Sequence, residues 1–475
     1  MKKVLQNIVK ILIIMLFTCI SGCLLYYIYK LNILNIKFFI ILSVVVTLFW
    51  LLVTINLTRK KSKKGTKIFM GIIVIILSCI YFFGLKYVTE TIKFVSNMTE
   101  NEYEEYKYYV LVLGNSNYTK IDNLKDKKIG FLSISSNYEK SKEKLSKKIN
   151  YELVEFQNTG ELVLALENGS IDAIVLDESF VELLKENKLP FIDESKVIYT
   201  YSLKIKGEYA SNKVDVNEDA FVLYISGSDS RTGIKTIARS DVNILAVVNP
   251  KKNKILLVTV PRDYYVQLHG TTGTLDKLTH AGLYGLEMSK NTIQDLLGVD
   301  INYSIKVSFS TLIKVVDVLD GIEIYSDKSF MKKTLDGKKC YFNKGYQKVT
   351  GECALAFSRE RFVYETGDIH RGQNQQVVLS AIIKKLSDPK YLIRYNDMLK
   401  AIDGSFETDM SYDDITSLVK NQLTNLNNWT IESIGLTGPN DMRETYSMGK
   451  QKLYVFLQDP KSINNAKTKI AEYLK

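Results

Sequence analysis

The sequence predicts an α/β protein with three N-terminal transmembrane helices, a small α/β accessory domain and a C-terminal α/β domain whose central sheet is flanked by helices. Three observations support this prediction. Three apolar runs lie within the first 90 residues, each near the roughly 20 residues that a helix needs to cross a bilayer. Strand-like and helix-like segments then alternate. Further on, three apolar runs each carry Asp and Arg at an end.

The apolar runs predict a multi-pass anchor in the cell membrane, residues 1–90. Basic residues crowd the segment 58–67, and three lysines lie in the first ten residues. Because basic loops stay on the cytoplasmic side, we expect the N-terminus and this segment in the cytoplasm and everything after Val88 outside the cell. The predicted spans are Ile11–Tyr29, Ile36–Leu57 and Ile68–Val88.

Composition narrows the possible functions. A net charge of +11 is partly explained by membrane topology, and no nucleic-acid-binding motif accompanies it. Few histidines and cysteines are present, none in a zinc-ligand or nucleophile pattern, so a zinc enzyme or a Ser-His-Asp hydrolase is poorly supported. Cys23 follows a start that resembles a lipoprotein signal, but an uncleaved helix is favoured. Cys340 and Cys353 are predicted to form either a disulfide or two buried free thiols.

Residues 107–206 are predicted to form the accessory domain, after a polar stalk at 89–106. The sequences at 123–130 and 166–174 resemble one lobe of extracytoplasmic solute-binding proteins. A two-lobed ligand clamp does not fit in this length, so the role of the domain stays open. The predicted strands are Tyr109–Leu113, Lys128–Leu132, Tyr151–Phe156 and Asp172–Leu176, and the predicted helices are Glu139–Lys148, Gly160–Glu167 and Phe180–Glu186.

The C-terminal domain is predicted for residues 217–475. Its first three runs are β-branched and aliphatic on both faces, as expected of central strands covered on both sides. Asp and Arg at the ends of these runs lie where α/β folds place their sites. The predicted strands are Ala220–Ser226, Val242–Val248, Ile255–Val260 and Thr430–Leu436, and the predicted helices are Leu278–Leu297, Val307–Leu319, one ending at Leu386, Asp413–Leu426 and Ser462–Leu474.

The segment 357–376 holds a cluster of arginines. A strand is predicted from Leu355, which would place Arg359 and Arg361 on one side of a sheet. A helix after Gly367 would place Asp368, Arg371 and Gln375 on one face. Three guanidinium groups would then converge on one anionic ligand, and guanidinium suits phosphate because its planar fork donates two parallel hydrogen bonds. The alternative is a set of solvated surface arginines in ion pairs.

Five motifs together resemble the LytR-CpsA-Psr family in order and spacing, over roughly residues 217–475. They are Gly-Ser-Asp-Ser-Arg (227–231), Arg-Ser-Asp (239–241), Pro-Arg-Asp (261–263), Asp-Lys-Leu-Thr-His-Ala (276–281) and Ser-Arg-Glu-Arg…Gly-Asp-Ile-His-Arg…Gln-Gln (358–376). The family implies a mixed central sheet and an extracellular, membrane-anchored phosphotransferase. Its members move an anionic glycopolymer, such as teichoic acid or capsule, from an undecaprenyl-pyrophosphate carrier to peptidoglycan.

The resemblance also implies roles for individual residues. The metal, Mg²⁺ or Mn²⁺, would be held by Asp229 and Asp241, and an apolar tunnel, lined in part by the 307–319 helix, would take the lipid tail. Catalysis would rest on Arg262, Asp368 and Arg371, with Asp368 either orienting Arg371 or acting as a base. The pyrophosphate would be held by Arg239, Arg262, Lys277, Arg359, Arg361, Arg371 and Gln375.

Some alternatives stay open at the level of sequence. Family members usually carry another arginine at the position of Asn374. Asp229 could instead cap a turn, Asp241 could pair with Arg239, and Asp263 is expected only to fix the loop after Arg262. Two other functions compete with glycopolymer transfer: hydrolysis of polyprenyl pyrophosphate, and a non-catalytic membrane receptor for an anionic ligand.

Overall fold

The computed structural model describes residues 2–32, 34–59, 64–99, 103–187, 189–206, 212–228, 238–392, 406–426 and 428–475. The chain divides into two compact units, described separately here. The first comprises Met1–Thr99, Ser387–Lys400 and Ser411–Asn427, and the second comprises Glu100–Leu386, Ala401–Met410 and Asn428–Lys475. The three-part division expected from the sequence stays a prediction.

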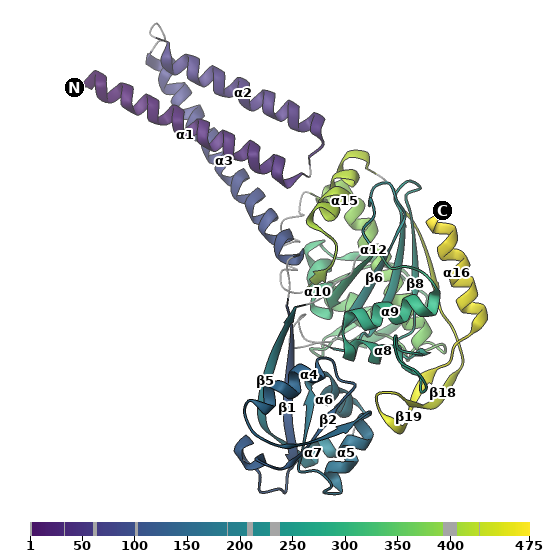
Figure 1. Cartoon of the computed structure of the whole chain (residues 1–475). Helices are drawn as coiled ribbons and strands as arrows, with labels where there is room; N and C mark the ends of the chain where they lie inside the picture. Colours follow the sequence, from purple (N-terminus) through teal and green to yellow (C-terminus); the bar gives the residue numbers. More distant parts are fainter. Residues whose placement is uncertain are drawn as a thin grey trace. The chain divides into compact units, whose positions relative to one another are not determined.

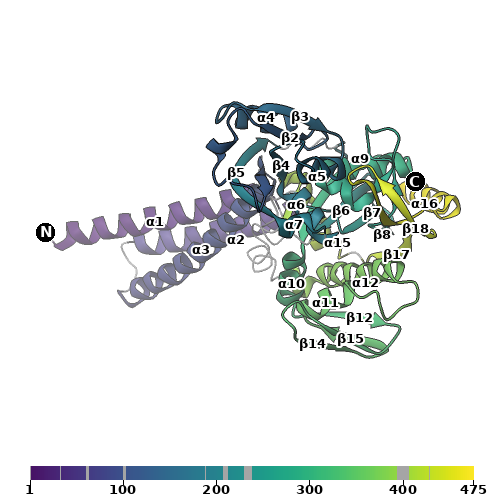
Figure 2. The same ribbon diagram turned by 90° about the horizontal axis from the view of Figure 1, so that it is seen from below.

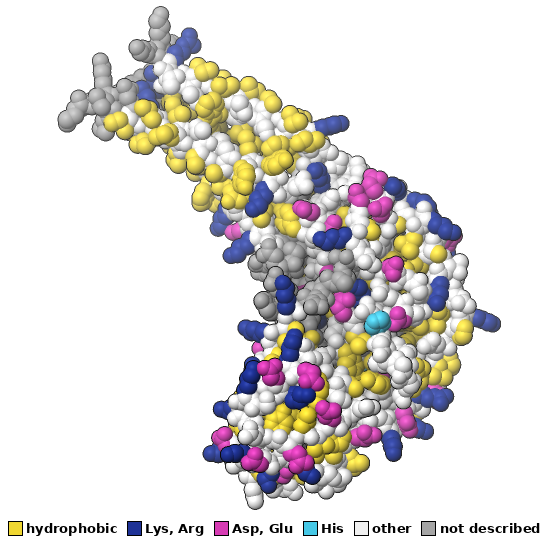
Figure 3. All heavy atoms as spheres, in the orientation of Figure 1, with side chains coloured by type: hydrophobic (Ala, Val, Ile, Leu, Met, Phe, Trp, Pro, Cys, Tyr) yellow, Lys and Arg dark blue, Asp and Glu magenta, His cyan; other side chains and the backbone are white. Residues whose placement is uncertain are grey.

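Three long helices in the first unit confirm the predicted spans (Figure 1): α1 (Lys2–Leu31), α2 (Ile36–Thr58) and α3 (Lys64–Thr99). Segments of 24, 23 and 29 residues within them are long and apolar enough to cross a membrane. Hydrophobic side chains dominate their surface (Figure 3). These helices fit a membrane anchor, and its orientation stays a prediction.

The predicted stalk is largely regular structure. Helix α3 continues to Thr99, and the first strand begins at Tyr103. The first unit also contains α15 (Tyr412–Asn425), where the Tyr412 hydroxyl donates to the Leu31 carbonyl at 3.3 Å. A short helix, α13 (Pro389–Leu392), belongs to the same unit.

The accessory domain is built on a five-stranded sheet with the order β3-β2-β4-β1-β5. Its predicted strands and helices are all present. Strand β5 was missed, because its Ser, Thr and Lys residues hide the apolar pattern. The elements are β1 (Tyr103–Leu113), η1 (Ile121–Leu124), β2 (Lys128–Leu132), α4 (Tyr138–Ser146), β3 (Glu152–Phe156), α5 (Thr159–Glu167), β4 (Ala173–Asp177), α6 (Glu178–Glu186), α7 (Phe191–Glu194) and β5 (Ser195–Lys206).

A six-stranded mixed sheet with the order β16-β11-β6-β7-β8-β17 forms the centre of the C-terminal domain. The neighbours β6, β7 and β8 are antiparallel, whereas β11 is parallel to β6 and β17 is parallel to β8. The C-terminal ends of β6, β8, β11 and β17 therefore share one edge with the start of β7. The bounds are β6 (Phe221–Ser228), β7 (Val242–Asn249), β8 (Lys254–Thr259), β11 (Tyr303–Ser308), β16 (Phe406–Thr408) and β17 (Thr430–Gly435).

Two predicted helices needed correction. The helix predicted at 278–297 is broken at Gly285, whose φ of 103° belongs to glycine. The helix predicted at 307–319 begins later, because strand β11 runs to Ser308, whose hydroxyl caps the following helix. The helices are α8 (Leu278–Ala281), η2 (Gly282–Tyr284), α9 (Leu286–Leu297), α10 (Phe309–Val318), α11 (Gly351–Ser358), α12 (Asp368–Ser387) and α16 (Pro460–Leu474).

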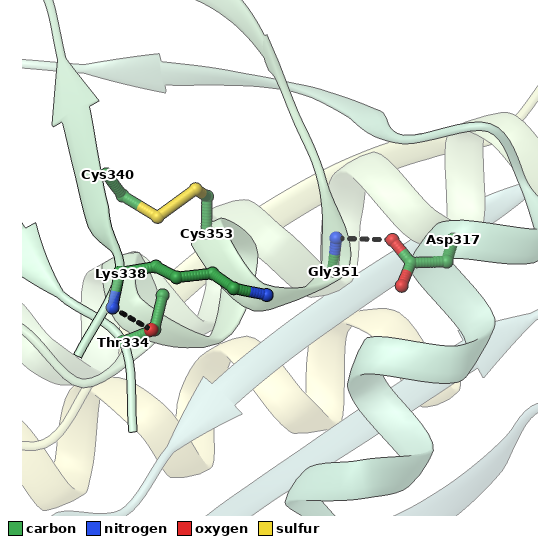
Figure 4. The surroundings of a disulfide bond; sticks show 6 residues. All are labelled: Asp317, Thr334, Lys338, Cys340, Gly351 and Cys353. Carbon is green, nitrogen blue, oxygen red and sulfur yellow. Dashed lines mark hydrogen bonds between the residues drawn. A yellow bond between two sulfur atoms is a disulfide. The ribbon is translucent and has the colours of Figure 1, made fainter. Parts of the chain in front are cut away.

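Unpredicted hairpins lie beside α11 and α12 (Figure 2). Cys340, on one of them, forms a disulfide with Cys353 of α11 (Figure 4), which settles the alternatives left open by the sequence. The Gly351 amide donates to the Asp317 carboxylate at 2.8 Å and ties α11 to α10. The remaining strands are β9 (Tyr265–Val266), β10 (Asp276–Lys277), β12 (Ile322–Ser326), β13 (Phe330–Lys333), β14 (Lys339–Phe342), β15 (Gly345–Val349), β18 (Asn440–Thr445) and β19 (Gly449–Phe456).

One hydrophobic cluster joins the accessory domain to the C-terminal domain within the second unit. Its members include Leu162 and Phe180 from the accessory domain and Leu283, Met448 and Leu453 from the C-terminal domain. All five side chains are at least nine-tenths buried. Burial of apolar side chains on this scale holds the two domains together.

Candidate functional site

A cavity of about 990 Å³ opens at the edge of the central sheet where four strands end and β7 begins. In open α/β sheets, ligand sites lie at such strand ends. The predicted site residues among the described part of the chain all line it: Arg239, Asp241, Arg262, Lys277, Arg359, Arg361, Asp368, Arg371 and Gln375. Asp229 lies outside the described residues.

Arg262 occupies the loop after β8, and Asp241 stands just before β7. Nη1 of Arg262 lies 2.8 Å from Oδ1 of Asp241. Asp241 therefore pairs directly with Arg262, and it also acts electrostatically on Arg239, the partner considered from the sequence. The loop backbone is fixed as well, because the Thr279 amide donates to the Arg262 carbonyl at 2.8 Å. The guanidinium group is thus oriented before any ligand binds.

Asp263 follows Arg262 in the chain, and its carboxylate is buried. It forms ion pairs with the Lys277 ammonium group and with Nε of Arg262. Burial alone would raise the pKa of Asp263, but Lys277 and Arg262 outweigh burial and lower it. The ionised carboxylate fixes two cationic side chains of the cavity, which supports the predicted loop-fixing role.

Helix α12 presents one face to the cavity. Asp368, Arg371 and Gln375 line it together, at the helical spacing expected from the sequence. Oδ1 of Asp368 lies 3.1 Å from Nη2 of Arg371 and 3.7 Å from Nη1 of Arg361. Burial lowers the pKa of Arg371, Asp368 opposes this, and Arg262 adds to it. Arg262, on the loop after β8, and Arg371, on α12, are therefore close enough to act on each other electrostatically.

The strand predicted from Leu355 was wrong. Gly351–Ser358 form helix α11, and Arg359 follows as its cap, so Arg359 and Arg361 do not share a face of a strand. The last five residues of the helix are all buried, and a short apolar run without periodicity does not distinguish helix from strand. Both arginines nevertheless line the cavity, with the Arg359 guanidinium 4.9 Å above the centre of the Phe309 ring.

Glu360 stabilises the loop between these arginines. One carboxylate oxygen accepts hydrogen bonds from the backbone amides of Arg361, Phe362 and Val363 at 2.6–3.0 Å. The other oxygen pairs with Lys332 at 2.8 Å. Glu360 therefore has a structural role, because it fixes the backbone of the loop that carries Arg361.

Asn374 lies on α12 at the position where the motif resemblance led us to expect another arginine. It is buried, and its side-chain amide donates to the Phe357 carbonyl at 3.2 Å. Its amide thus joins α12 to α11 instead of adding a charge to the cavity.

Apolar side chains form part of the cavity wall beside the arginines. Phe309 of α10, Leu335 from the hairpins, and Leu355 and Ala356 of α11 line it. Of the stripe predicted on 307–319, Phe309 lines this wall, whereas Val316 is fully buried. The cavity therefore offers an apolar surface next to a cationic one, as an amphiphilic anion requires.

Glu186, from the accessory domain, also lines the cavity. Its carboxylate forms ion pairs with Arg239 and, at 3.4 Å, with Nη2 of Arg262. The sequence does not indicate a role for Glu186 at the site. An acidic residue at the end of a helix is usually solvated, and its partners Arg239 and Arg262 lie far away along the chain.

Asp241 is the one predicted metal ligand among the described residues, and it lines the cavity. Asp241 offers oxygen ligands at the cavity, and hard cations such as Mg²⁺ bind through one or two carboxylates together with substrate phosphates. No group of three or more His, Cys, Asp or Glu side chains that could hold a metal ion occurs in the part of the chain that the structure describes. Asp241 could contribute one carboxylate to a metal ion held jointly with a phosphate ligand.

Comparison with known proteins identifies the family. The pattern of the LytR_cpsA_psr family matches residues 193–470, more than half of the chain. The chain belongs to this family. The LytR-CpsA-Psr match spans every arginine of the cavity and confirms the resemblance seen in the sequence motifs.

Relatives within the LytR-CpsA-Psr family include transferases from bacilli. The chain is 35% identical over 217 residues to the polyisoprenyl-teichoic acid–peptidoglycan teichoic acid transferase TagU of Bacillus cereus, covering 46% of this chain and 68% of that protein. Its identity to TagU of Bacillus subtilis is 33% over 212 residues, covering 44% and 67%. The crystal structure of B. subtilis TagU matches with 28% identity and a TM-score of 0.42, covering 54% of this chain and 98% of that one.

Proposed function

We propose that this protein transfers an anionic glycopolymer, of the teichoic acid or capsule kind, from a polyprenyl pyrophosphate carrier such as undecaprenyl pyrophosphate to peptidoglycan. The main support is the convergence of five guanidinium groups and Lys277 on one cavity. Similar proteins are named as transferases that act between polyisoprenyl-teichoic acid and peptidoglycan. The apolar wall at Phe309 and Leu355 would take the start of the lipid tail.

The chemistry requires little covalent work from the protein. An acceptor hydroxyl attacks the phosphorus that carries the glycopolymer, and the bond from this phosphorus to the bridging oxygen breaks. The lipid phosphate leaves with that oxygen and takes up the proton that the hydroxyl loses. Charge accumulates on the phosphate oxygens, so prepositioned guanidinium groups lower the barrier. Arg262 and Arg371 are held for this task by Asp241 and Asp368, respectively. In this proposal Asp368 orients Arg371.

Magnesium belongs to the proposal as a partner of the pyrophosphate. Asp241 would hold it together with Asp229. When bound, the ion would neutralise phosphate charge. Membrane anchoring by α1–α3 would keep the cavity near a lipid carrier that stays in the bilayer, with the cavity on the outer side of the membrane.

Substitution of Arg262 tests the function. Arg262→Ala and Arg371→Ala should each lower transfer from a lipid-pyrophosphate-linked glycopolymer to peptidoglycan by about a hundredfold or more, the range seen when a charge-stabilising donor is removed. Arg443→Ala is the matched control, because Arg443 is about half exposed and pairs with Asp441, two residues away. Product analysis by mass spectrometry distinguishes transfer from hydrolysis.

Three results would contradict the proposal. Unchanged transfer in Arg262→Ala would exclude the cavity as the active site. Release of free glycopolymer at the same rate with and without peptidoglycan would favour a phosphatase, and binding without magnesium-dependent turnover would favour a receptor.

A further inference from the structure

Helix α6 of the accessory domain ends at the cavity. Its last residue, Glu186, pairs with Arg239 and lies 3.4 Å from Nη2 of Arg262. Both arginines are among those proposed to hold the pyrophosphate, and both side chains are more than four-fifths buried. A carboxylate and a phosphate group present similar oxygens to guanidinium, so Glu186 occupies the kind of position that a phosphate would need.

Contacts made by α6 and by α5 join the accessory domain to the C-terminal domain. The Phe180 ring, on the same helix, lies 5.7 Å from the ring of Tyr284 in the C-terminal domain. The backbone amide of Thr159 donates to the Ser447 carbonyl at 3.0 Å, and its hydroxyl donates to the same carbonyl at 2.8 Å. The position of Glu186 therefore follows from a packed interface between the two domains.

The local sequence does not favour a carboxylate here. A negative side chain at the C-terminal end of a helix is repelled by the helix dipole. Lys185, the preceding residue, suits this end, whereas Glu186 does not. The ion pairs with Arg239 and Arg262 offset this repulsion. A glutamate at this position is therefore explained by its contacts in the cavity and not by the stability of the helix.

We propose that Glu186 acts as an internal competitor for the anionic ligand, so that the accessory domain lowers the affinity of the cavity for pyrophosphate. This inference rests on the proposed function, because it assumes that Arg239 and Arg262 bind the pyrophosphate. A ligand must displace the Glu186 carboxylate from both guanidinium groups before it can pair with them. Small anions that engage only these two arginines are therefore disfavoured, whereas a ligand that also contacts Arg371 and the apolar wall gains enough to displace Glu186.

Calorimetric titration of the full chain in detergent micelles tests this inference. Inorganic pyrophosphate is the first probe and farnesyl pyrophosphate the second, each with Mg²⁺ present. Glu186→Gln should bind inorganic pyrophosphate about tenfold more tightly than the wild type, the ratio expected for the loss of one competing charge-assisted hydrogen bond. Farnesyl pyrophosphate should bind more tightly than inorganic pyrophosphate to both proteins, with a similar gain in Glu186→Gln, because both probes displace the same carboxylate.

Glu167→Gln is the matched control, because Glu167 is an exposed last residue of helix α5 in the same domain. It should bind both probes as the wild type does. Glu186→Ala provides a second variant, and thermal unfolding checks that each protein remains folded.

The outcomes separate the two proposals. Equal or weaker binding of pyrophosphate by Glu186→Gln, with binding by the wild type intact and sensitive to Arg262→Ala, would overturn the competitor role and leave the proposed function standing. Absence of binding in every variant would overturn the proposed function and this inference with it.

Discussion

Single residues at the cavity hold one another in place through opposite charges. Asp263 fixes Lys277 and Arg262, and Asp368 contacts Arg361 and Arg371. In each group a carboxylate aligns cations that would otherwise repel one another. The motifs in the sequence predicted that these residues share a site, but the pairing itself depends on loop geometry, which short motifs do not specify.

His280 provides a prediction about pH. It is buried, and its Nδ1 lies 2.6 Å from Oδ1 of Asp276. Burial lowers the pKa of His280, Asp276 opposes this, and Lys277 and Arg239 add to the lowering. The folded-state pKa of His280 lies below the unfolded value of about 6.5. The contribution of neutral His280 to folding stability is therefore fully present above that value, and it is lost as the pH falls through the folded-state pKa.

Thermal unfolding from pH 8 to pH 5.5 should therefore show falling stability in the wild type, with a slope of up to about 1.4 kcal/mol per pH unit from this group. His280→Asn should flatten the profile, since it keeps a donor for Asp276 and removes the titration. His269→Asn, at a half-exposed histidine paired with Asp295, is the control. An identical slope in His280→Asn and wild type would refute the assignment.

At the level of elements, the sequence predicted what is buried and missed what is half exposed. The central strands β6, β7 and β8 are apolar on both faces, and their positions were predicted closely. Hairpin strands β12 to β15 alternate buried residues with exposed lysines and tyrosines, a pattern too short and too polar to stand out. Helix α11 is an exception: its last five residues are buried, but a short apolar run does not distinguish helix from strand, and a strand was predicted there.

The disulfide between β14 and α11 gives a prediction for these elements. It spans a sequence separation of 13 residues, so replacing both cysteines with serine should lower the free energy of unfolding by about 2–3 kcal/mol. Leu355 and Ala356 of α11 line the cavity, so ligand affinity should fall too. Chemical denaturation and calorimetry measure the two effects.

Cys79→Ser is the control, because Cys79 is a free, exposed cysteine of α3. A reducing agent should bring the wild type to the stability of the double variant. If reduction leaves the wild type unchanged, the two thiols do not form this bond in solution.

For the whole molecule, the cluster shared by the accessory and C-terminal domains was beyond sequence reasoning. Phe180 and Leu162 fit the helical pattern of the accessory domain, and Met448 and Leu453 lie in a hairpin that was not predicted. Each side chain was explicable within its own domain. Their contact depends on how the two domains pack against each other. Residue patterns within each domain do not predict that packing.

Met448 tests whether the two domains unfold together. Met448→Ala should lower the free energy of unfolding by about 2–5 kcal/mol, because it leaves a cavity at a fully buried side chain. The second unit should still unfold in one transition by thermal denaturation, since the cluster belongs to both domains. Met442→Ala, at a half-exposed methionine of the same hairpin, is the control. Separate melting of the accessory domain in the wild type would contradict a shared core.

The shared cluster also bears on how such chains can be rearranged. Phe180, Tyr284 and Met448 form one buried surface from two sequence regions, so neither region is free to change alone. A chimera that exchanges the accessory domain for that of a relative should require compensating changes at Leu283, Met448 and Leu453. Recombination between relatives should accordingly favour crossovers outside the segment 103–456, leaving both partners of the interface inherited together.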